Sequence, residues 1–376
     1  MKIAILTLPL HVNYGGNVQN FALQQTLLKL GHDVVTINCQ EAKIGTLRYG
    51  LSTAKRLFQQ PKSSRRLLFT KKEKEIISLN HKRFVCDYIK LTEPVDFTEL
   101  SLFFKKNKFD AVFVGSDQVW RPKYTPCIES YFLSFIQDNT AIKKISYAAS
   151  FGSDKWEYNS QQHSICKSLI EKFDALSVRE SLGADMCKEY FSVNAQHVLD
   201  PTMLLTKEEY IEIFKSENLP NHKGKLFNYT LDVDEAKNKL IRNISSHVHK
   251  DFFTTYPEKT QKKTLFIHDI KTYQYPSVPA WLKSFFDADF IITDSFHGTV
   301  FSIIFNKPFI ALSNKERGAA RFISLLNMFG LESRLVTDVD KFDKNIIDDN
   351  IDYVEVNKRL EQYRIMSLDF ISNALS

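Results

Sequence analysis

A histidine at position 297 stands between two apolar runs, in the sequence TDSFHGTVFSIIFNKPFIAL. Residues 289–293 predict a strand and residues 298–306 a helix, which places His297 at the start of that helix. A helix N-terminus favours a neutral imidazole and anionic ligands, and a histidine there can act as general acid or base. Taken alone, the pattern fits an ordinary capped helix start equally well. The candidate substrate-binding residues beside it are Ser295, Gly298 and Thr299.

A carboxylate follows the apolar run of residues 109–116, in the sequence GSDQVW. Asp117 at the end of a strand can accept the proton of a sugar hydroxyl, or it can close an Asx-type turn. We take it as a candidate catalytic base. Its candidate substrate-binding neighbours are Ser116, Gln118 and Trp120, of which Trp120 packs either on a sugar or in the core.

Two adjacent glycines follow the first apolar run, in the sequence HVNYGGNVQN. Glycine lets the backbone approach a ligand closely, and the helix after it offers its N-terminus to an anion. The spacing is not that of a dinucleotide-binding fingerprint. A tight turn in which Asn17 caps the helix is the structural alternative. The candidate ligand contacts here are Gly15, Gly16, Asn17 and Gln19.

Three arginines are candidate ligands for an anion. Arg179 directly follows the apolar run ALSV, where its fork can bind a phosphate or carboxylate, or can pair with Glu180. Arg317 and Arg321 are four residues apart and share a helical face if that helix begins early enough. Asp200, by contrast, precedes a proline in LDPTMLL, which is typical of a turn, and we interpret it as structural.

Short apolar runs that alternate with helical patterns must position these groups. Residues 2–8, a helical pattern that ends at Gly31, and residues 33–39 form a βαβ opening, which implies a parallel sheet. The fold class expected is α/β, with one domain over 1–205 that carries a basic, mostly helical insert at 41–108, and a second over 222–352. In such sheets ligands bind beyond the carboxyl ends of the strands, so the cleft between two such domains is the expected site.

The composition is that of a soluble globular protein, with 376 residues, 43% hydrophobic and 25% charged. The sequence has no apolar run of about 20 residues and no signal-peptide pattern. Its five cysteines lack CxxC spacing, which argues against a disulfide framework and a zinc site. The Asp-x-Asp strings at 232–234 and 338–340 lie in charged turns, and we interpret neither as a metal site. We expect a cytoplasmic protein.

The net charge of +6 is unevenly distributed, because residues 41–83 contain 12 Lys and Arg but only three Asp and Glu. Such a segment indicates an anionic partner, such as a membrane surface or a phosphate, or simply a solvated helical face. The sequence contains no recognised nucleic-acid-binding module, so nucleic acid is not an expected partner.

Six motifs occur in order over about residues 15–325: GGNVQNFALQ, GSDQVW, SYAASFG, SVRE, LDPTMLL and TDSFHGTVFSIIFNKPFIAL. In this combination the chain resembles the polysaccharide pyruvyl transferase family. The resemblance implies a GT-B-like fold of two Rossmann-like domains, with the last helix, 355–376, crossing back to the first. It also implies transfer of the pyruvyl group of phosphoenolpyruvate to two hydroxyls of a sugar. A cyclic ketal forms and phosphate leaves, in the synthesis of capsule, exopolysaccharide or cell-wall glycan.

The same resemblance makes His297 the acid that protonates the methylene carbon of the donor, and Arg179 a ligand of its anionic groups. The role of Asp117 as base rests on its position alone. The mechanism requires no metal and no cofactor besides the donor substrate. Family members often carry Arg-Leu-His-Gly where this chain has Ser295-Phe296-His297-Gly298. Another arginine must then supply the missing charge, and the candidates are Arg321, Arg317 and Arg334.

The acceptor is expected to be a sugar or a lipid-linked oligosaccharide. If it is lipid-linked, the basic segment would hold the enzyme peripherally at the inner face of an anionic membrane. Two other functions stay open from the sequence: a GT-B-like glycosyltransferase that uses a nucleotide sugar, and a non-catalytic glycan-binding protein.

Overall fold

The computed structural model describes residues 1–40, 71–125, 127–138, 140–257, 269–313 and 319–376. Its first half is built on a six-stranded sheet in the order β2–β1–β5–β6–β7–β8, with parallel pairing throughout. The strands are β1 (Lys2–Leu6), β2 (Asp33–Thr36), β5 (Ala111–Asp117), β6 (Lys143–Ala149), β7 (Ala175–Val178) and β8 (Gln196–His197). Strands covered on both faces read as continuous apolar runs, and β5 is buried along its whole length.

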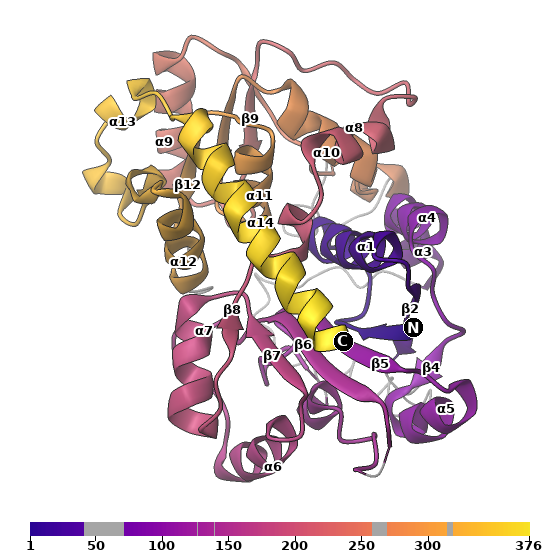
Figure 1. The fold of residues 1–376 in the computed structure, drawn as a ribbon. Helices are drawn as coiled ribbons and strands as arrows, with labels where there is room; N and C mark the ends of the chain where they lie inside the picture. Colours follow the sequence, from indigo (N-terminus) through magenta and orange to yellow (C-terminus); the bar gives the residue numbers. More distant parts are fainter. Residues whose placement is uncertain (41–70, 126, 139, 258–268, 314–318) are drawn as a thin grey trace, which may run out of the picture.

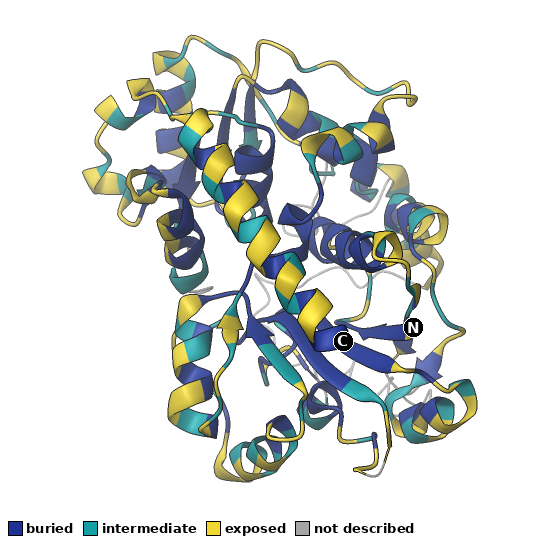
Figure 2. Cartoon of the chain, in the orientation of Figure 1, coloured by how far each residue is buried: buried dark blue, intermediate teal, exposed yellow. Residues whose placement is uncertain are grey.

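The helix that follows β1 is one of the most deeply buried elements of the chain. Helix α1 (Tyr14–Lys29) buries 13 of its 16 residues, and Figure 2 shows it dark along most of its length. Its N-cap is Asn13, whose side-chain oxygen accepts a hydrogen bond from the Gly16 N–H at 3.2 Å. Asn17, the cap expected in the structural alternative, lies inside the helix instead. The two glycines therefore form its first turn.

Three further helices of this half lie against the first sheet: α5 (Leu100–Asn107), α6 (Ser160–Ile170) and α7 (Ser181–Met186). Helix α8 (Lys207–Phe214) lies instead beside α10 (Val278–Asp287) of the second half. The described part of the insert holds α3 (Lys71–Ile77), α4 (Leu79–Tyr88), α5 and β4 (Val95–Asp96), and β4 pairs with β3 (Cys39–Gln40), which directly precedes the insert. The run 33–39 is thus divided between two sheets. Ile37 and Asn38 belong to neither strand, and the Asn38 carbonyl accepts from Val95 N at 3.0 Å.

The second half is built on a five-stranded parallel sheet in the order β10–β9–β11–β12–β13. Its strands are β9 (Leu226–Tyr229), β10 (Phe252–Phe253), β11 (Phe290–Thr293), β12 (Phe309–Leu312) and β13 (Leu335–Val336). Its helices are α9 (Glu235–His247), α10 (Val278–Asp287), α11 (Phe296–Ile304), α12 (Ala320–Phe329) and α13 (Asn345–Asp348). The predicted α/β class with two Rossmann-like units is confirmed by these two parallel sheets.

The last helix, α14 (Tyr353–Leu375), runs from the second half to the first (Figure 1). Near its start the Tyr353 hydroxyl donates to the carbonyl of Lys307, which precedes β12. Further along, the Ser367 hydroxyl accepts from Leu199 N at 3.0 Å, and near its end the Ala374 carbonyl accepts from Lys143 Nζ at 3.3 Å. The helix therefore ties the two sheets together at the side shown in Figure 1.

The insert helices also join the two halves. The Ile77 carbonyl accepts from Tyr275 N at 3.2 Å, and Asn80 Nδ2 donates to the Tyr275 carbonyl at 2.7 Å. From α1, the Tyr14 hydroxyl donates to the Pro276 carbonyl at 2.7 Å. These bonds fix α1 against the second half, which matters because the site lies at the N-terminus of α1.

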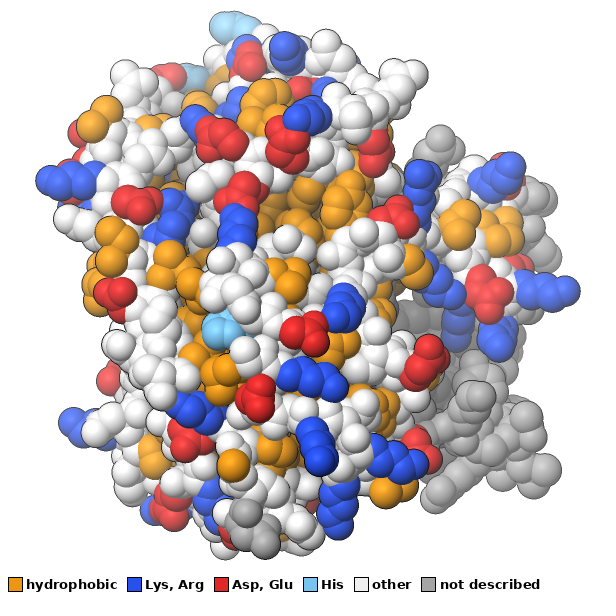
Figure 3. Space-filling model, turned by 45° about the vertical axis from the view of Figure 1, so that its right-hand side comes forward, with side chains coloured by type: hydrophobic (Ala, Val, Ile, Leu, Met, Phe, Trp, Pro, Cys, Tyr) orange, Lys and Arg blue, Asp and Glu red, His pale blue; other side chains and the backbone are white. Residues whose placement is uncertain are grey.

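The described surface is of mixed charge. On the face shown in Figure 3, Lys and Arg side chains are interspersed with Asp and Glu. Most of the basic segment, residues 41–70, lies outside the described residues. No helix in the described part of the chain combines the length and apolarity that a membrane span needs.

Candidate active site

A cavity of about 890 Å³ opens between the two halves at the carboxyl ends of their strands. The first half contributes the loop after β1, the end of β5 and the turn that follows it. The second half contributes the loop after β11 and the start of α12. The polar side chains on the wall include His11, Asn13, Asp117, Gln118, Lys123, Tyr124, Asp294, Ser295, His297 and Arg321.

His297 lies in the first turn of α11, as expected from the sequence. Ser295 is the N-cap, and its hydroxyl accepts from Gly298 N at 3.3 Å. The Cβ of any residue at position 298 would lie 2.1 Å from the Thr293 hydroxyl, so only glycine fits between the helix and the end of β11. These contacts fix the direction of the His297 side chain, which is 9% exposed as a residue.

The first turn of α1 meets His297 from the other half of the molecule. A Cβ added to Gly15 would lie 2.1 Å from Nδ1 of His297, 2.5 Å from Cγ and 2.7 Å from Cε1. These similar distances place that position over the face of the imidazole ring. The N-termini of α1 and α11 therefore converge on one side chain, and both carry partial positive charge that favours an anion.

Replacing Gly15 by alanine is expected to lower activity at least tenfold, because the new methyl must displace the His297 ring. The melting temperature of the protein should change little. Gly16→Ala is the matched control. Its Cβ would meet the Asn13 side chain, 2.9 Å from Nδ2, so it strains the N-cap of α1 without meeting the His297 ring. Turnover and thermal unfolding of both variants test this. Equal effects of the two alanines on turnover would contradict it.

Behind His297 lies a buried carboxylate that the sequence pattern had suggested was structural. Asp200 Oδ2 is 3.7 Å from His297 Nε2 and accepts from Arg179 Nη1 at 3.0 Å. Burial alone would raise the pKa of Asp200, but the contacts with His297, Arg179 and Thr202 hold that pKa well below its usual range. Asp200 is therefore a carboxylate held ionised next to the candidate acid.

Arg179 is the centre of a buried ion cluster. It pairs with Glu180 through Nε at 3.1 Å, with Asp200, and with Asp117 Oδ1 at 3.8 Å. Burial would lower the pKa of its guanidinium, but these carboxylates raise it above the ordinary value. The ring of Phe296 covers the guanidinium at 4.3 Å. Because the Arg179 side chain is only 1% exposed, it organises the site from below and does not reach the cavity as an anion ligand.

Asp117 ends β5 in an unusual backbone conformation. Its φ of 69° lies in the left-handed region, which residues other than glycine seldom adopt. The Asp117 carbonyl accepts from Val119 N at 2.8 Å and from Ser150 N at 3.1 Å, and these bonds hold the bend. The carboxylate consequently lies on the cavity wall. Backbone strain of this kind is typical of functional sites.

A family model for polysaccharide pyruvyl transferases matches residues 13–316, which is most of the chain and includes Asp117, Arg179, Asp200 and His297. The chain belongs to the polysaccharide pyruvyl transferase family. No curated protein matches it.

Solved structures resemble this pyruvyl transferase family member in overall chain path. UDP-GlcNAc 2-epimerase from Methanocaldococcus jannaschii has 14% identity and a TM-score of 0.49, covering 96% of this chain and 92% of that one. The Neisseria meningitidis enzyme bound to UDP-GlcNAc has 12% identity and a TM-score of 0.46, covering 98% and 94%. A mutant O-GlcNAc transferase from Thermobaculum terrenum has 9% identity and a TM-score of 0.48, covering 100% and 66%.

The residues predicted for the pyruvyl transferase site differ in where the structure places them. Those on the cavity wall are Asp117, Gln118, Ser295, His297 and Arg321. Those buried beneath it or behind it are Gly15, Gly16, Asn17, Gln19, Ser116, Arg179, Gly298 and Thr299. Ser116 and Gln19 support the floor, because the Ser116 hydroxyl donates to Asp200 at 3.2 Å and Gln19 donates to the Thr7 hydroxyl at 3.2 Å. Arg317 lies outside the described residues.

Trp120 belongs to neither the wall nor the floor. Its side chain is completely buried and its Nε1 donates to the Tyr131 carbonyl at 3.1 Å. It stacks on Phe132 with ring centroids 5.1 Å apart. The core alternative therefore holds for Trp120, because the turn after Asp117 directs it away from the cavity.

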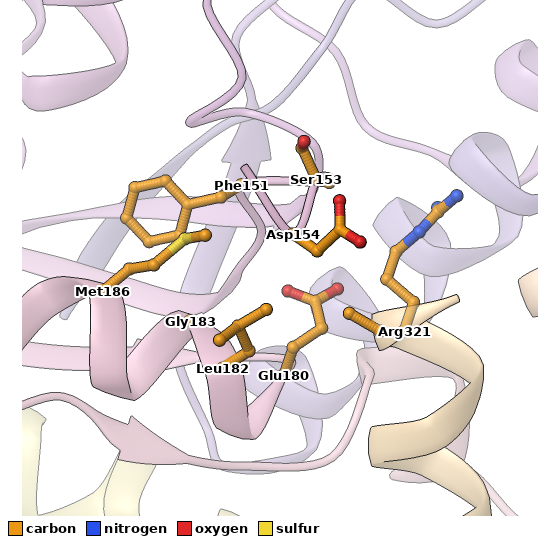
Figure 4. Close-up of a pocket in the computed structure, with 10 residues that line it drawn as sticks. Phe151, Ser153, Asp154, Glu180, Leu182, Gly183, Met186 and Arg321 are labelled. Atoms are coloured by element: carbon orange, nitrogen blue, oxygen red, sulfur yellow. The ribbon is translucent and has the colours of Figure 1, made fainter. Parts of the chain in front are cut away.

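Of the arginines considered for the charge missing at Ser295, two lie in the described residues. Arg334 is buried and donates to the carbonyls of Ile346 at 2.7 Å and Asp349 at 2.6 Å, so it holds α13 in place. Arg321, in the first turn of α12, lines the main cavity. It also borders a small cavity of about 10 Å³, enough for about one water. Figure 4 shows Asp154 and Glu180 on the same side of this small cavity as Arg321, with Phe151 and Met186 opposite.

The sequence patterns missed several wall residues. Asp294 accepts from Leu231 N at 2.5 Å and pairs with Lys237 Nζ at 2.8 Å. It thereby joins the loop after β9 to the start of α11. His11, Lys123 and Tyr124 gave no local signal, since they lie in loops. Among the described residues, no cluster of three or more His, Cys, Asp or Glu is arranged to hold a metal ion.

Proposed function

We propose that the protein transfers the pyruvyl group of phosphoenolpyruvate to two hydroxyls of a sugar in a bacterial surface-glycan precursor, forming a cyclic ketal. The observation that carries this proposal is the arrangement of His297 and Asp117. The two side chains come from opposite halves of the molecule and line one cavity, and the buried pair of Asp200 and Arg179 lies behind both. A proton donor and a proton acceptor at one cavity are what ketal formation requires.

The proposed reaction begins when His297 donates a proton to the methylene carbon of the donor, which makes the neighbouring carbon electrophilic. The first sugar hydroxyl bonds to that carbon and its proton passes to Asp117. The bond from carbon to the phosphate oxygen then breaks, and the proton on Asp117 leaves with the phosphate. The second hydroxyl bonds to the same carbon and returns a proton to His297. One hydroxyl proton thus replaces that given to the new methyl group, and both side chains regain their starting states.

The anionic groups of the donor need positive charge, which we assign to Arg321 and to the N-termini of α1 and α11. Lys123 is a weaker candidate, because its amine pairs with Glu157 at 3.0 Å and is 68% exposed. Cations and helix N-termini stabilise a departing phosphate more than they stabilise a neutral sugar. We therefore propose that the donor binds next to the N-termini of α11 and α12.

The loops of the first half offer a different environment, which we assign to the acceptor. Tyr124 is 49% exposed at the cavity, and the guanidinium of Arg121 lies under its ring at 4.5 Å. Arg121 is itself fixed by two bonds to Glu157, at 3.1 and 3.0 Å. A rigid aromatic face near the amides of Asn13, Asn38 and Gln118 suits a sugar ring. That the acceptor is lipid-linked, and that the basic segment contacts an anionic membrane, stay predictions.

Arg321→Gln is expected to raise the KM for phosphoenolpyruvate by roughly 10–100-fold, since a hydrogen bond to a charged group contributes about 1.5–3 kcal/mol. Steady-state kinetics of phosphate release measures this. Arg359→Gln is the control, because that arginine lies on α14 and pairs with Glu355 at 2.9 Å at the surface. A KM that Arg321→Gln leaves unchanged would remove Arg321 from the donor site.

The experiment that tests the function is phosphate release from phosphoenolpyruvate with a panel of acceptors, lipid-linked oligosaccharides included. Thermal unfolding with phosphoenolpyruvate, UDP-sugars and GDP-sugars runs in parallel. We expect stabilisation by phosphoenolpyruvate and acceptor-dependent phosphate release. Stabilisation by a nucleotide sugar alone would favour the glycosyltransferase alternative. Glycan binding that is unchanged by His297→Ala, with no turnover of any donor, would favour the binding protein.

A further inference from the structure

The two nitrogens of the His297 ring have different surroundings. Nε2 is buried, points toward Asp200 Oδ2 at 3.7 Å, and has no hydrogen-bond partner among the described residues. Nδ1 lies at the opposite side, where the backbone of Gly15 covers the face of the ring. Nδ1 forms hydrogen bonds in the plane of the ring. Gly15 approaches from above that plane, so it does not block a hydrogen bond to Nδ1. Only one of the two nitrogens therefore faces a fixed protein charge.

Asp200 is built to keep its position and its charge. One oxygen, Oδ1, accepts from the backbone N–H of Thr202 at 3.0 Å and from its hydroxyl at 2.6 Å. The other, Oδ2, accepts from Arg179 at 3.0 Å and from Ser116 at 3.2 Å. The side chain is completely buried. A carboxylate with four donors and no solvent contact has one orientation, and that orientation presents Oδ2 to His297.

We propose that Asp200 is a positioning residue that keeps a proton on Nε2 of His297, so that Nδ1 is the nitrogen that exchanges a proton with the substrate. A carboxylate behind an imidazole fixes its tautomer and stabilises the imidazolium. The 3.7 Å separation shortens by a small rotation of the ring when Nε2 donates to Oδ2. The assignment of the tautomer does not depend on the proposed function. Only the identity of the substrate atom that Nδ1 faces rests on that function.

The other charged groups near the ring fit this assignment. Arg179 shares Oδ2 with His297 and offsets part of the negative charge of Asp200. Asp117 lies beyond Arg179, 3.8 Å from its Nη2. His11 and Arg321 line the same cavity. Of these groups, only Asp200 lies within ion-pair distance of a nitrogen of His297 in the described residues.

The test is nitrogen NMR of the full-length protein labelled with ¹⁵N-histidine, in alkaline buffer and without any ligand. The signals of His297 are those that disappear in His297→Gln. We expect the Nε2–H tautomer in the wild type and a majority of Nδ1–H, or a mixture, in Asp200→Asn. Asp348→Asn is the control. It removes the partner of His247, whose Nε2 is 2.9 Å from Asp348, and must leave the His297 signals unchanged.

An Nδ1–H tautomer in the wild type would overturn the proposal, whatever the variant shows, so the test holds even if Asp200→Asn does not fold. An unchanged tautomer in a folded Asp200→Asn would overturn it too. In kinetics, Asp200→Asn is expected to lower kcat by at least tenfold with the KM for phosphoenolpyruvate within about twofold. The Nε2–H tautomer in a protein that never turns over phosphoenolpyruvate would uphold the positioning role and refute the proposed donor.

Discussion

Replacing His297 by alanine is expected to lower the rate of phosphate release from phosphoenolpyruvate by on the order of 10²–10⁴-fold, the usual contribution of a general acid or base. The effect should fall on kcat, because in the proposed mechanism protonation of the methylene carbon precedes every bond to the sugar. Since the proposed donor ligands are Arg321 and the helix N-termini, the KM of the donor should change little. Single-turnover and steady-state measurements on the same preparation separate the two quantities.

His247→Ala is the matched control, since that histidine is also in a helix and near a carboxylate but lies at the surface, far from the cavity wall. It should retain wild-type turnover. The melting temperature of His297→Ala should stay close to that of the wild type, because the ring makes no hydrogen bond shorter than 3.5 Å to a described residue. A His297→Ala protein that is folded and fully active would end the assignment of this residue as the acid.

The largest expected effect on stability belongs to Arg179. Replacing it by methionine leaves the carboxylates of Asp200 and Glu180 buried without their cation. Breaking a buried ion cluster on one side typically costs about 3–5 kcal/mol of unfolding free energy. Urea unfolding of Arg179→Met against the wild type measures this. Arg83→Met is the control, because its pair with Asp87 is at the surface and such pairs contribute about 1 kcal/mol or less.

The pH dependence gives this prediction a second test. In the wild type the pKa of Asp200 is lower in the folded state than in the unfolded chain. Its contribution is therefore full above the unfolded pKa of about 3.9 and is lost as the pH falls toward the folded value. Without Arg179 the pKa of Asp200 is held down less. The stability difference between variant and wild type should then be full near pH 7 and shrink on acidification below about pH 4. A difference that is absent near neutral pH would contradict the structural role of Arg179.

Much of the fold follows from local sequence patterns. The runs at 2–8, 109–116 and 289–293 are strands because a strand buried on both faces needs consecutive apolar residues. Gly298 and Ser295 mark the start of α11 because a cap and a close approach to Thr293 require those residue types. His297 and Asp117 could be selected because both follow such strands, and the ends of parallel strands meet at one edge of each sheet.

Other residues could not be placed in this way, because their roles depend on segments distant in sequence. Trp120 is in the core since the bend at Asp117 directs it away from the cavity. Arg179 lies below the site because Asp200, 21 residues later, and Phe296, in the other half, enclose it. Arg334 is excluded as an anion ligand because it donates to two backbone carbonyls, and the sequence does not show this pairing. Side-chain exposure and pairing are properties of the assembled fold.

By itself, the sequence determined the class of the protein, the two series of parallel strands, the family motifs and the histidine at the start of α11, since each depends on residue type and spacing along a short stretch. The tertiary structure alone decided the role of DPT at 200–202, which as a local pattern is only a turn. Asp200 stands behind His297 because the loop after β8 and the start of α11, from different halves, come together. The face of that histidine ring is covered by Gly15, 282 residues away in the chain. Such a contact has no signature in either segment, because it arises only when two sheets and two helix N-termini are brought together.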